Sequence, residues 1–164
     1  MNRHTLTLES SDGRVLSVPR DIAMLSETIS SLIEDVIPDD HTPIPLYSID
    51  YETLKRVVSW MVRHSQEGPP PEVDVKKHDG IAYHIRDWER VMFAAEERSD
   101  LFRMMNAANY LQISPLLKSS TAYVAEKVSS LSVDEARDYL NLVDDYTPEE
   151  KERIRLDSQW VQLP

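Results

Sequence analysis

The most restrictive feature of this sequence is a series of helix-start signals in its last third. Ser132-Val133-Asp134-Glu135 is a capping box, in which the first and last side chains bond to each other's backbone N–H groups. Thr147-Pro148-Glu149-Glu150 adds a proline in the first helical turn, and Ser114-Pro115 has the same order of cap and proline. These signals predict three short helices, near residues 115–130, 133–142 and 148–158.

The three predicted helices carry many apolar residues for their length. Helices this short are marginal in water, so their stability must come from packing an apolar face against something else. We expect that something to be another chain, which would make the protein an adaptor; the alternative is that the helices fold back on the first part of the chain. The apolar residues concerned are Leu116, Leu117, Val124, Val128, Leu131, Tyr139, Leu140, Leu142, Ile154 and Trp160.

Strand signals are confined to the start of the chain. Thr5-Leu6-Thr7-Leu8 alternates with period two, Ser11-Asp12-Gly13 supplies turn residues, and Val15-Leu16-Ser17-Val18 resumes a strand pattern, which together predict a β-hairpin. Pro43-Ile44-Pro45-Leu46 predicts a short or edge strand, because a proline cannot donate a ladder hydrogen bond.

Apolar residues spaced by three and four predict three more helices, all before the three terminal helices. One runs from about Ile22 to Glu34, one follows the cap Asp50 and packs on the sheet, and one runs from about Asp100 to Leu111. The expected inward faces are Ile22, Leu25, Ile29, Leu32 and Ile33; Leu54, Val57, Val58, Met61 and Val62; and Leu101, Phe102, Met105, Ala108 and Leu111.

Residues 66–83 have the composition of a mobile surface loop. They contain Gly68, three successive prolines and mixed charges, with few residues able to bury. Regular structure is expected to resume near Asp87.

The overall charge limits the partners of the chain. Its 164 residues have a formal net charge of −11, which argues against nucleic acid and anionic membrane surfaces, because both are bound through clustered Lys and Arg. Without cysteine there is no disulfide and no Cys-ligated zinc, and no run approaches the roughly 20 apolar residues of a membrane span. We expect a soluble, intracellular protein.

No constellation of catalytic, cofactor-binding or metal-ligating residues stands out. The five histidines include no pair at the helical spacing of a metal site, and three glycines cannot form a phosphate-binding loop. Adjacent carboxylates occur at Asp39-Asp40, Asp144-Asp145 and Glu149-Glu150, in a loop or a first helical turn rather than in a converging pair. We therefore expect no enzymatic activity, cofactor or metal.

Several motifs occur in one order along nearly the whole chain: Leu8-Glu9-Ser10-Ser11-Asp12-Gly13, Leu46 after the proline strand, Ala107-Ala108-Asn109-Tyr110-Leu111, Leu116-Leu117, Asp134-Glu135-Ala136-Arg137, Asp145-Tyr146-Thr147 and Arg155-Leu156-Asp157-Ser158-Gln159-Trp160. In this order they resemble the Skp family, the adaptor subunits of SCF ubiquitin ligases. The resemblance implies an α/β (α+β) fold: a BTB/POZ-like domain over residues 1–130, with a small sheet covered by helices, and a C-terminal helical extension over residues 131–164.

The resemblance also implies a function. The protein would be a non-catalytic adaptor in the cytoplasm and nucleus that bridges a cullin scaffold to F-box substrate receptors, with ubiquitin transfer carried out by other subunits. The F-box-binding residues would be Leu117, Val124, Val128, Leu142, Tyr146 and Trp160, and the cullin-binding residues Met105, Asn109 and Tyr110. From the residues alone, Asn109 and Tyr110 could simply terminate a helix, and Trp160 could pack on its own domain.

Two departures from the family pattern leave alternatives open. Asn106 stands where the family usually has an aliphatic residue, and the family's Trp-Asp pattern is blurred into Ile85-Arg86-Asp87-Trp88-Glu89. The alternatives are a divergent member that binds F-box proteins without a cullin, and an elongin-C-like module, against which the extension beyond residue 130 argues. Without a partner, the protein is expected to self-associate or to have mobile C-terminal helices.

Overall fold

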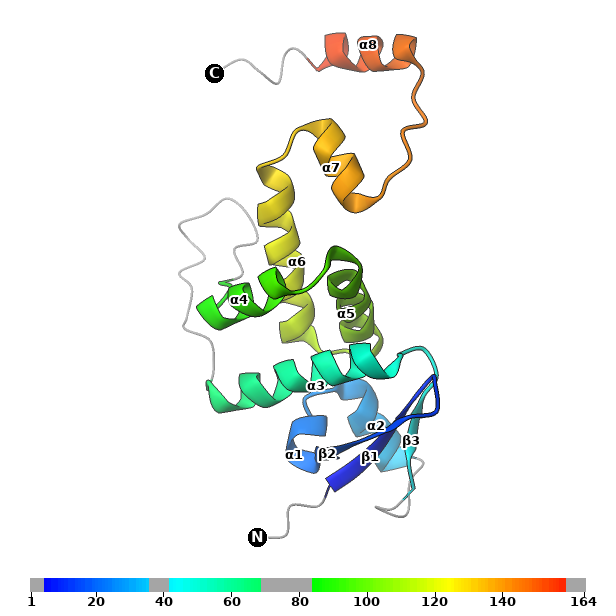
Figure 1. Ribbon diagram of the computed structural model, residues 1–164, viewed down its shortest axis with the longest axis vertical. Helices are drawn as coiled ribbons and strands as arrows, with labels where there is room; N and C mark the ends of the chain where they lie inside the picture. Colours follow the sequence, from blue (N-terminus) through cyan, green and yellow to red (C-terminus); the bar gives the residue numbers. More distant parts are fainter. Residues whose placement is uncertain (1–4, 36–41, 69–83, 159–164) are drawn as a thin grey trace. The chain divides into compact units, whose positions relative to one another are not determined.

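The computed structural model describes residues 5–35, 42–68 and 84–158, and shows a small sheet followed by a series of helices (Figure 1). The chain divides into two compact units, Met1–Glu126 and Lys127–Pro164. The division falls inside the helix predicted near residues 115–130, whereas the resemblance placed the boundary at the end of that helix, at residue 130. Most of the loop predicted over residues 66–83 lies outside the described residues.

The sheet has three strands in the order β2-β1-β3. β1 (Thr5–Ser10) pairs antiparallel with β2 (Val15–Pro19), so the predicted hairpin is confirmed. Gly13 lies in its turn with φ of 74°, a conformation that favours glycine. β3 (Ile44–Leu46) pairs in parallel with β1 and forms the sheet edge, which is where a strand containing proline is tolerated.

The prediction of a single helix over residues 22–34 was wrong, because two helices occupy this segment. α1 (Arg20–Ala23) ends before α2 (Glu27–Asp35) begins. The fully buried Ser26 lies between them, and its hydroxyl accepts a hydrogen bond from the backbone N–H of Ile29 at 3.1 Å. This bond caps α2. The apolar spacing continues across the break, so periodicity alone could not detect it.

α3 (Tyr51–Gln66) begins where predicted and contacts β1, β2 and the later helix α5. Asp50 caps it, because its carboxylate accepts a 3.0 Å hydrogen bond from the backbone N–H of Thr53. The predicted inward face of this helix omitted Trp60, which is fully buried. Its indole N–H donates to Oε1 of Glu89 at 3.1 Å, and this partner lets a tryptophan and a carboxylate share the core.

α4 (Asp87–Ala95) and α5 (Arg98–Tyr110) follow. The inward face of α5 consists of Leu101, Met104, Ala107 and Ala108. Phe102 and Met105, which were expected to face inward, are only half-buried. The apolar residues of this segment fit two neighbouring helical faces, and packing against α3 selects the one that contains Met104.

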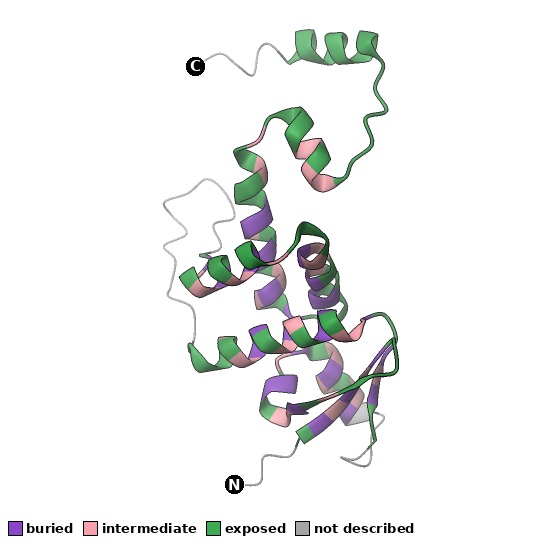
Figure 2. Ribbon diagram, viewed as in Figure 1, coloured by how far each residue is buried: buried purple, intermediate pink, exposed green. Residues whose placement is uncertain are grey.

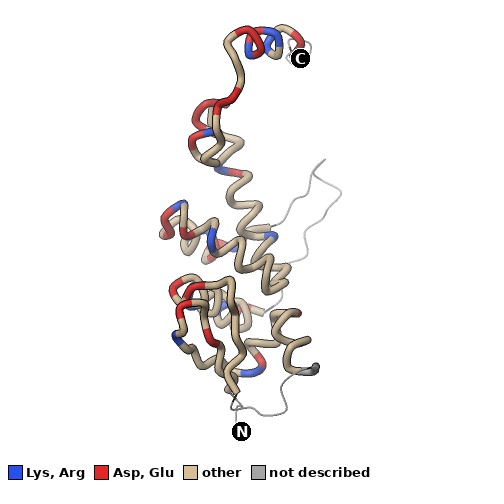
Figure 3. Tube along the Cα trace, turned by 90° about the vertical axis from the view of Figure 1, so that its right-hand side faces the viewer, with Lys and Arg blue, Asp and Glu red and all other residues tan. Residues whose placement is uncertain are grey.

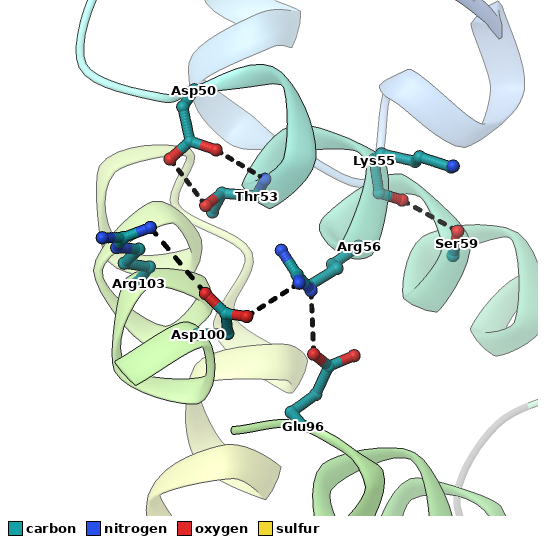
Figure 4. Close-up of polar contacts among 8 residues, drawn as sticks. All are labelled: Asp50, Thr53, Lys55, Arg56, Ser59, Glu96, Asp100 and Arg103. Carbon is teal, nitrogen blue, oxygen red and sulfur yellow. Dashed lines mark hydrogen bonds and ion pairs between the residues drawn. The ribbon is translucent and has the colours of Figure 1, made fainter. Parts of the chain in front are cut away.

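An ion-pair network joins α3 to the start of α5. Figure 4 shows Arg56 between two carboxylates: its Nε lies 2.8 Å from Oε2 of Glu96, and its Nη2 lies 2.8 Å from Oδ2 of Asp100. The Arg56 side chain is only 28% exposed. This partial shielding makes the pairs stronger than fully exposed ones.

The three terminal helices are confirmed as α6 (Ser114–Ser129), α7 (Val133–Leu140) and α8 (Pro148–Asp157). Both predicted capping boxes are present, at Ser132 with Glu135 and at Thr147 with Glu150. Leu116 of α6 is completely buried. In contrast, neither α7 nor α8 has a buried residue, and Figure 2 shows both in the colours of exposed or partly exposed chain.

Candidate partner-binding surfaces

The residues predicted to bind a cullin lie in the last turns of α5. Asn109 is exposed and Tyr110 is 40% exposed, while Met105 is half-buried. A tyrosine that is neither buried nor fully solvated presents both an apolar ring and a hydroxyl to a partner. The end of α5 therefore exposes Asn109 and part of the Tyr110 ring to solvent.

The backbone fixes this helix end tightly. The N–H of Ile113 donates to the carbonyl of Ala108 at 2.9 Å, and the N–H of Gln112 donates to the carbonyl of Asn109 at 3.1 Å. These two bonds form a Schellman motif, with Gln112 at a φ of 52° in the position where glycine is most common. Because the position holds glutamine, the sequence did not reveal the motif.

Residues from the start of α2 satisfy the last carbonyls of α5. The hydroxyl of Thr28 donates to the carbonyl of Tyr110 at 2.9 Å, and the hydroxyl of Ser26 donates to the carbonyl of Leu111 at 2.6 Å. The end of α5 is thus oriented by hydrogen bonds from residues more than 80 positions earlier in the sequence. Sequence reasoning missed this role of Ser26 and Thr28, since no local pattern marks so distant a contact.

Two depressions lie along α5. The first, which we call the α5 socket, has a volume of about 220 Å³ and is lined by Ser48, Ile49, Asp50, Thr53, Arg103, Asn106, Ala107 and Tyr110. The second has a volume of about 240 Å³ and is lined by Glu27, Ala108, Asn109, Gln112, Ile113, Ser114 and Leu117. The second brings together Asn109, predicted for the cullin, and Leu117, predicted for the F-box.

The α5 socket holds opposite charges close together. Partial burial acts to raise the pKa of Asp50, but hydrogen bonds from the backbone and hydroxyl of Thr53, together with the charge of Arg103, hold this pKa below its usual value. Arg103 also lies 3.8 Å from Oδ1 of Asp100 (Figure 4). Asp50 therefore stays ionised at neutral pH, and its charge is balanced by Arg103.

Three of the residues predicted to bind an F-box lie on α6. Leu117 and Val128 are half-buried, whereas Val124 is only 8% exposed and packs within the described chain. Near it, the ring of Tyr123 lies against Phe93 of α4, with centroids 5.6 Å apart. Leu117 and Val128 thus offer more surface to a partner than Val124 does.

The other predicted F-box residues lie beyond α6 in the second unit, to which Val128 also belongs. Leu142 is 58% exposed and Tyr146 is 49% exposed, while Trp160 lies outside the described residues. Among the described residues of this unit, four further large apolar side chains are exposed and were not predicted as site residues: Val133, Val143, Ile154 and Leu156. Ile154 was noted only as part of the apolar excess, and Val143 and Leu156 fit no helical stripe that would have drawn attention to them.

Of the adjacent acids Asp144 and Asp145, Asp144 is engaged with two cationic side chains. Asp144 contacts Nζ of Lys151 and lies 3.8 Å from Nη1 of Arg137. The hydrogen bond from Lys151 lowers the pKa of Asp144, which is the opposite of what a proton-donating carboxyl needs. Acidic residues predominate in α7 and at the start of α8 (Figure 3). Those in the first turns interact favourably with the helix dipoles.

The described residues contain no group of three His, Asp or Glu side chains that could hold a metal ion. Among the same residues, no helix has both the length and the apolar character of a membrane span.

Comparison with known proteins accounts for both units. Residues 4–66 match the model of the Skp1 family tetramerisation domain, and residues 114–161 match that of the Skp1 family dimerisation domain. The SCF ubiquitin ligase complex protein SKP1a of Dictyostelium discoideum is 36% identical over 155 residues, which cover 94% of each chain. This chain belongs to the Skp1 family. The resemblance inferred from its motifs and the expected mixed α/β, POZ-type fold are confirmed.

Other relatives extend the likeness across animals and fungi. A Skp1-related protein of Caenorhabditis elegans is 33% identical over 162 residues, covering 96% of this chain and 91% of that one. The E3 ubiquitin ligase complex SCF subunit sconC of Emericella nidulans is 33% identical over 162 residues, covering 99% of each chain. The likeness to these Skp1 family members therefore runs through both units.

Proposed function

We propose that this chain is an adaptor subunit of an SCF-type ubiquitin ligase, that it joins a cullin scaffold to F-box substrate receptors, and that it has no catalytic activity of its own. Relatives that match it over nearly their whole length are named as SCF complex subunits. We also propose that it acts in the cytoplasm and nucleus, which imaging of a tagged chain would test.

The observation that carries the F-box half is the exposure of apolar side chains in the second unit. α7 and α8 bury no residue, yet Leu142, Tyr146, Ile154 and Leu156 are each about half exposed. Leu142 and Tyr146 lie between the two helices, and Ile154 and Leu156 lie on α8. An exposed apolar surface of this kind favours a protein partner that covers it. Trp160 belongs to the same proposal because of its position beyond α8 in the sequence.

Binding to an F-box peptide tests this half. Replacing Tyr146 or Trp160 by alanine is expected to weaken binding by about 2 kcal/mol or more, as for other interface aromatics. Arg153→Ala, an exposed polar position on α8, is the matched control and should bind like the parent. If no F-box peptide bound the wild-type chain, or if Tyr146→Ala and Trp160→Ala both bound as tightly as the parent, the proposed surface would be wrong.

The cullin half rests on the end of α5. The double variant Asn109→Lys with Tyr110→Lys should lose cullin binding and keep F-box binding, because both side chains are solvent-accessible and distant in sequence from α7 and α8. Equal retention of both partners would refute this half.

Without a partner, the exposed apolar side chains should cause self-association or leave α7 and α8 mobile. Sedimentation measures the first, and hydrogen exchange measures the second: amides of α7 and α8 should become more protected when an F-box peptide is added. Protection that is already complete in the free monomer would count against the proposal.

A further inference from the structure

The α5 socket differs from an apolar partner pocket in the side chains that form its rim. Its floor is closed by buried residues such as Ala107, Thr53 and Ile49, each at most 4% exposed. Its rim includes Arg103, Asn106 and Tyr110, which lie three to four residues apart on one face of α5 and are all exposed to solvent. A partner that packs on Tyr110 would therefore also cover Asn106.

Asn106 has unused hydrogen-bonding capacity. Over residues 5–35, 42–68 and 84–158 its side-chain amide takes part in no hydrogen bond, although it can donate two and accept two. Asp50, in contrast, already accepts both Thr53 bonds. The Asn106 amide thus keeps all its donors and acceptors for a partner side chain.

The charges around the socket select the kind of side chain that it can receive. The charges near the socket already have counter-charges, since Asp50 faces Arg103 and Asp100 pairs with Arg56. An added ionic group would therefore lose its hydration without gaining an unpaired counter-charge. An apolar side chain would strip water from the Asn106 amide without replacing its hydrogen bonds. A neutral carboxamide both donates and accepts, so it can pair with Asn106 in two bonds.

We propose that the α5 socket is a specificity site that receives a carboxamide side chain of the cullin scaffold and pairs it with Asn106. This inference rests on the proposed cullin-binding function, which it deepens by naming the chemistry of the contact. A chain with asparagine at this position would prefer a scaffold with a carboxamide there over one with an apolar residue.

The test compares Asn106→Leu with the parent in binding to each cullin amino-terminal domain that the wild-type chain binds. Loss of the paired amide should weaken cullin binding about ten-fold, with F-box peptide binding unchanged. Lys55→Leu places the same apolar side chain at another exposed position and should change neither. Undiminished or tighter cullin binding by Asn106→Leu would overturn the inference.

A second measurement does not depend on the leucine variant. A photo-crosslinking amino acid at position 106 should attach to a segment of the cullin that contains Asn or Gln within reach, and attachment only to segments without either would overturn the inference. Failure of the inference can be told from failure of the proposed function. If Asn109→Lys with Tyr110→Lys abolishes cullin binding while Asn106→Leu does not, only the specificity site is wrong; if the wild-type chain binds no cullin, both fall.

Discussion

The hydroxyl of Thr28 donates a 2.9 Å hydrogen bond to the backbone carbonyl of Tyr110, so a residue at the start of α2 holds the last turn of α5. The contact involves no side chain of α5. It can therefore be removed without changing any side chain that α5 offers to a partner, so that only the position of the helix end is tested.

Thr28→Val removes this bond with little change in shape, and we expect weaker cullin binding together with a loss of about 1 kcal/mol in the free energy of unfolding. Thr28→Ser keeps the hydroxyl and should restore most of the affinity. F-box peptide binding, measured in parallel, should not change. Cullin affinities that are equal for the valine and serine variants would show that Thr28 does not position the helix end.

Glu89 is only 1% exposed and accepts bonds from the Trp60 indole and from the backbone N–H of Arg86. Glu89→Ala leaves the buried indole N–H unpaired and opens a cavity, so we expect a loss of about 2 to 4 kcal/mol in urea unfolding. Val91→Ala on the same helix should cost less than about 0.5 kcal/mol, because Val91 is 71% exposed. Similar losses for the two variants would contradict a structural role for the Trp60–Glu89 contact.

The capping box of α8 can be tested by replacing two adjacent glutamates, only one of which belongs to the box. Glu150 accepts a 2.9 Å hydrogen bond from the backbone N–H of Thr147, whereas Glu149 shares the first helical turn without being part of the box. Both alanine variants lose a favourable charge at the helix start, but only Glu150→Ala loses the reciprocal cap. We expect amides of α8 to exchange about two- to five-fold faster in Glu150→Ala than in Glu149→Ala, and equal rates would argue against the cap.

The environment of His64 should make the free energy of unfolding depend on pH. Its ring stacks on Trp60 with centroids 4.4 Å apart, and its pKa is lowered first by burial and then by the charge of Arg86, against an opposing effect of Glu89. The unfolded chain therefore binds a proton at a higher pH than the folded chain. Stability is fully present above the ordinary histidine pKa of about 6.5 and falls as the pH drops below it.

Urea unfolding between pH 7.5 and 5.5 measures this effect. His64→Phe keeps an aromatic ring against Trp60 and should flatten the pH dependence in this range, while His84→Gln, at an exposed position, should leave it unchanged. The carboxylates whose pKa values are lowered, such as Asp50 and Glu135, lose their contributions only at more acidic pH. A slope that persists in His64→Phe would assign it to another group.

Local signals in the sequence were sufficient for most of the secondary structure. Caps at Asp50, Ser132 and Thr147 begin helices as expected, because each depends only on residues three positions away. The helix break at Ser26 and the inward orientation of the Met104 side chain could not be predicted in the same way. Both are decided by packing between segments far apart in the sequence.

The candidate surfaces, too, were predicted where local motifs mark them and missed where they depend on tertiary packing. Family motifs drew attention to Asn109, Tyr110, Leu142 and Tyr146, and the structure places each of them at the surface. Motifs did not reveal that Val124 is mostly buried, nor that Asn106 shares a depression with Arg103 and Tyr110. Such neighbourhoods depend on how α5 meets the turn before α3, which no single segment encodes.

The absence of any buried residue in α7 and α8 affects how mutations there would be detected. A saturation screen that selects for folded protein should tolerate polar replacements at Leu142, Tyr146 and Leu156, because they have no core contacts to lose. The same library selected for partner capture should reject them. Variants of this segment would thus be expressed normally, withstand heat like the parent, and still be defective in a cell.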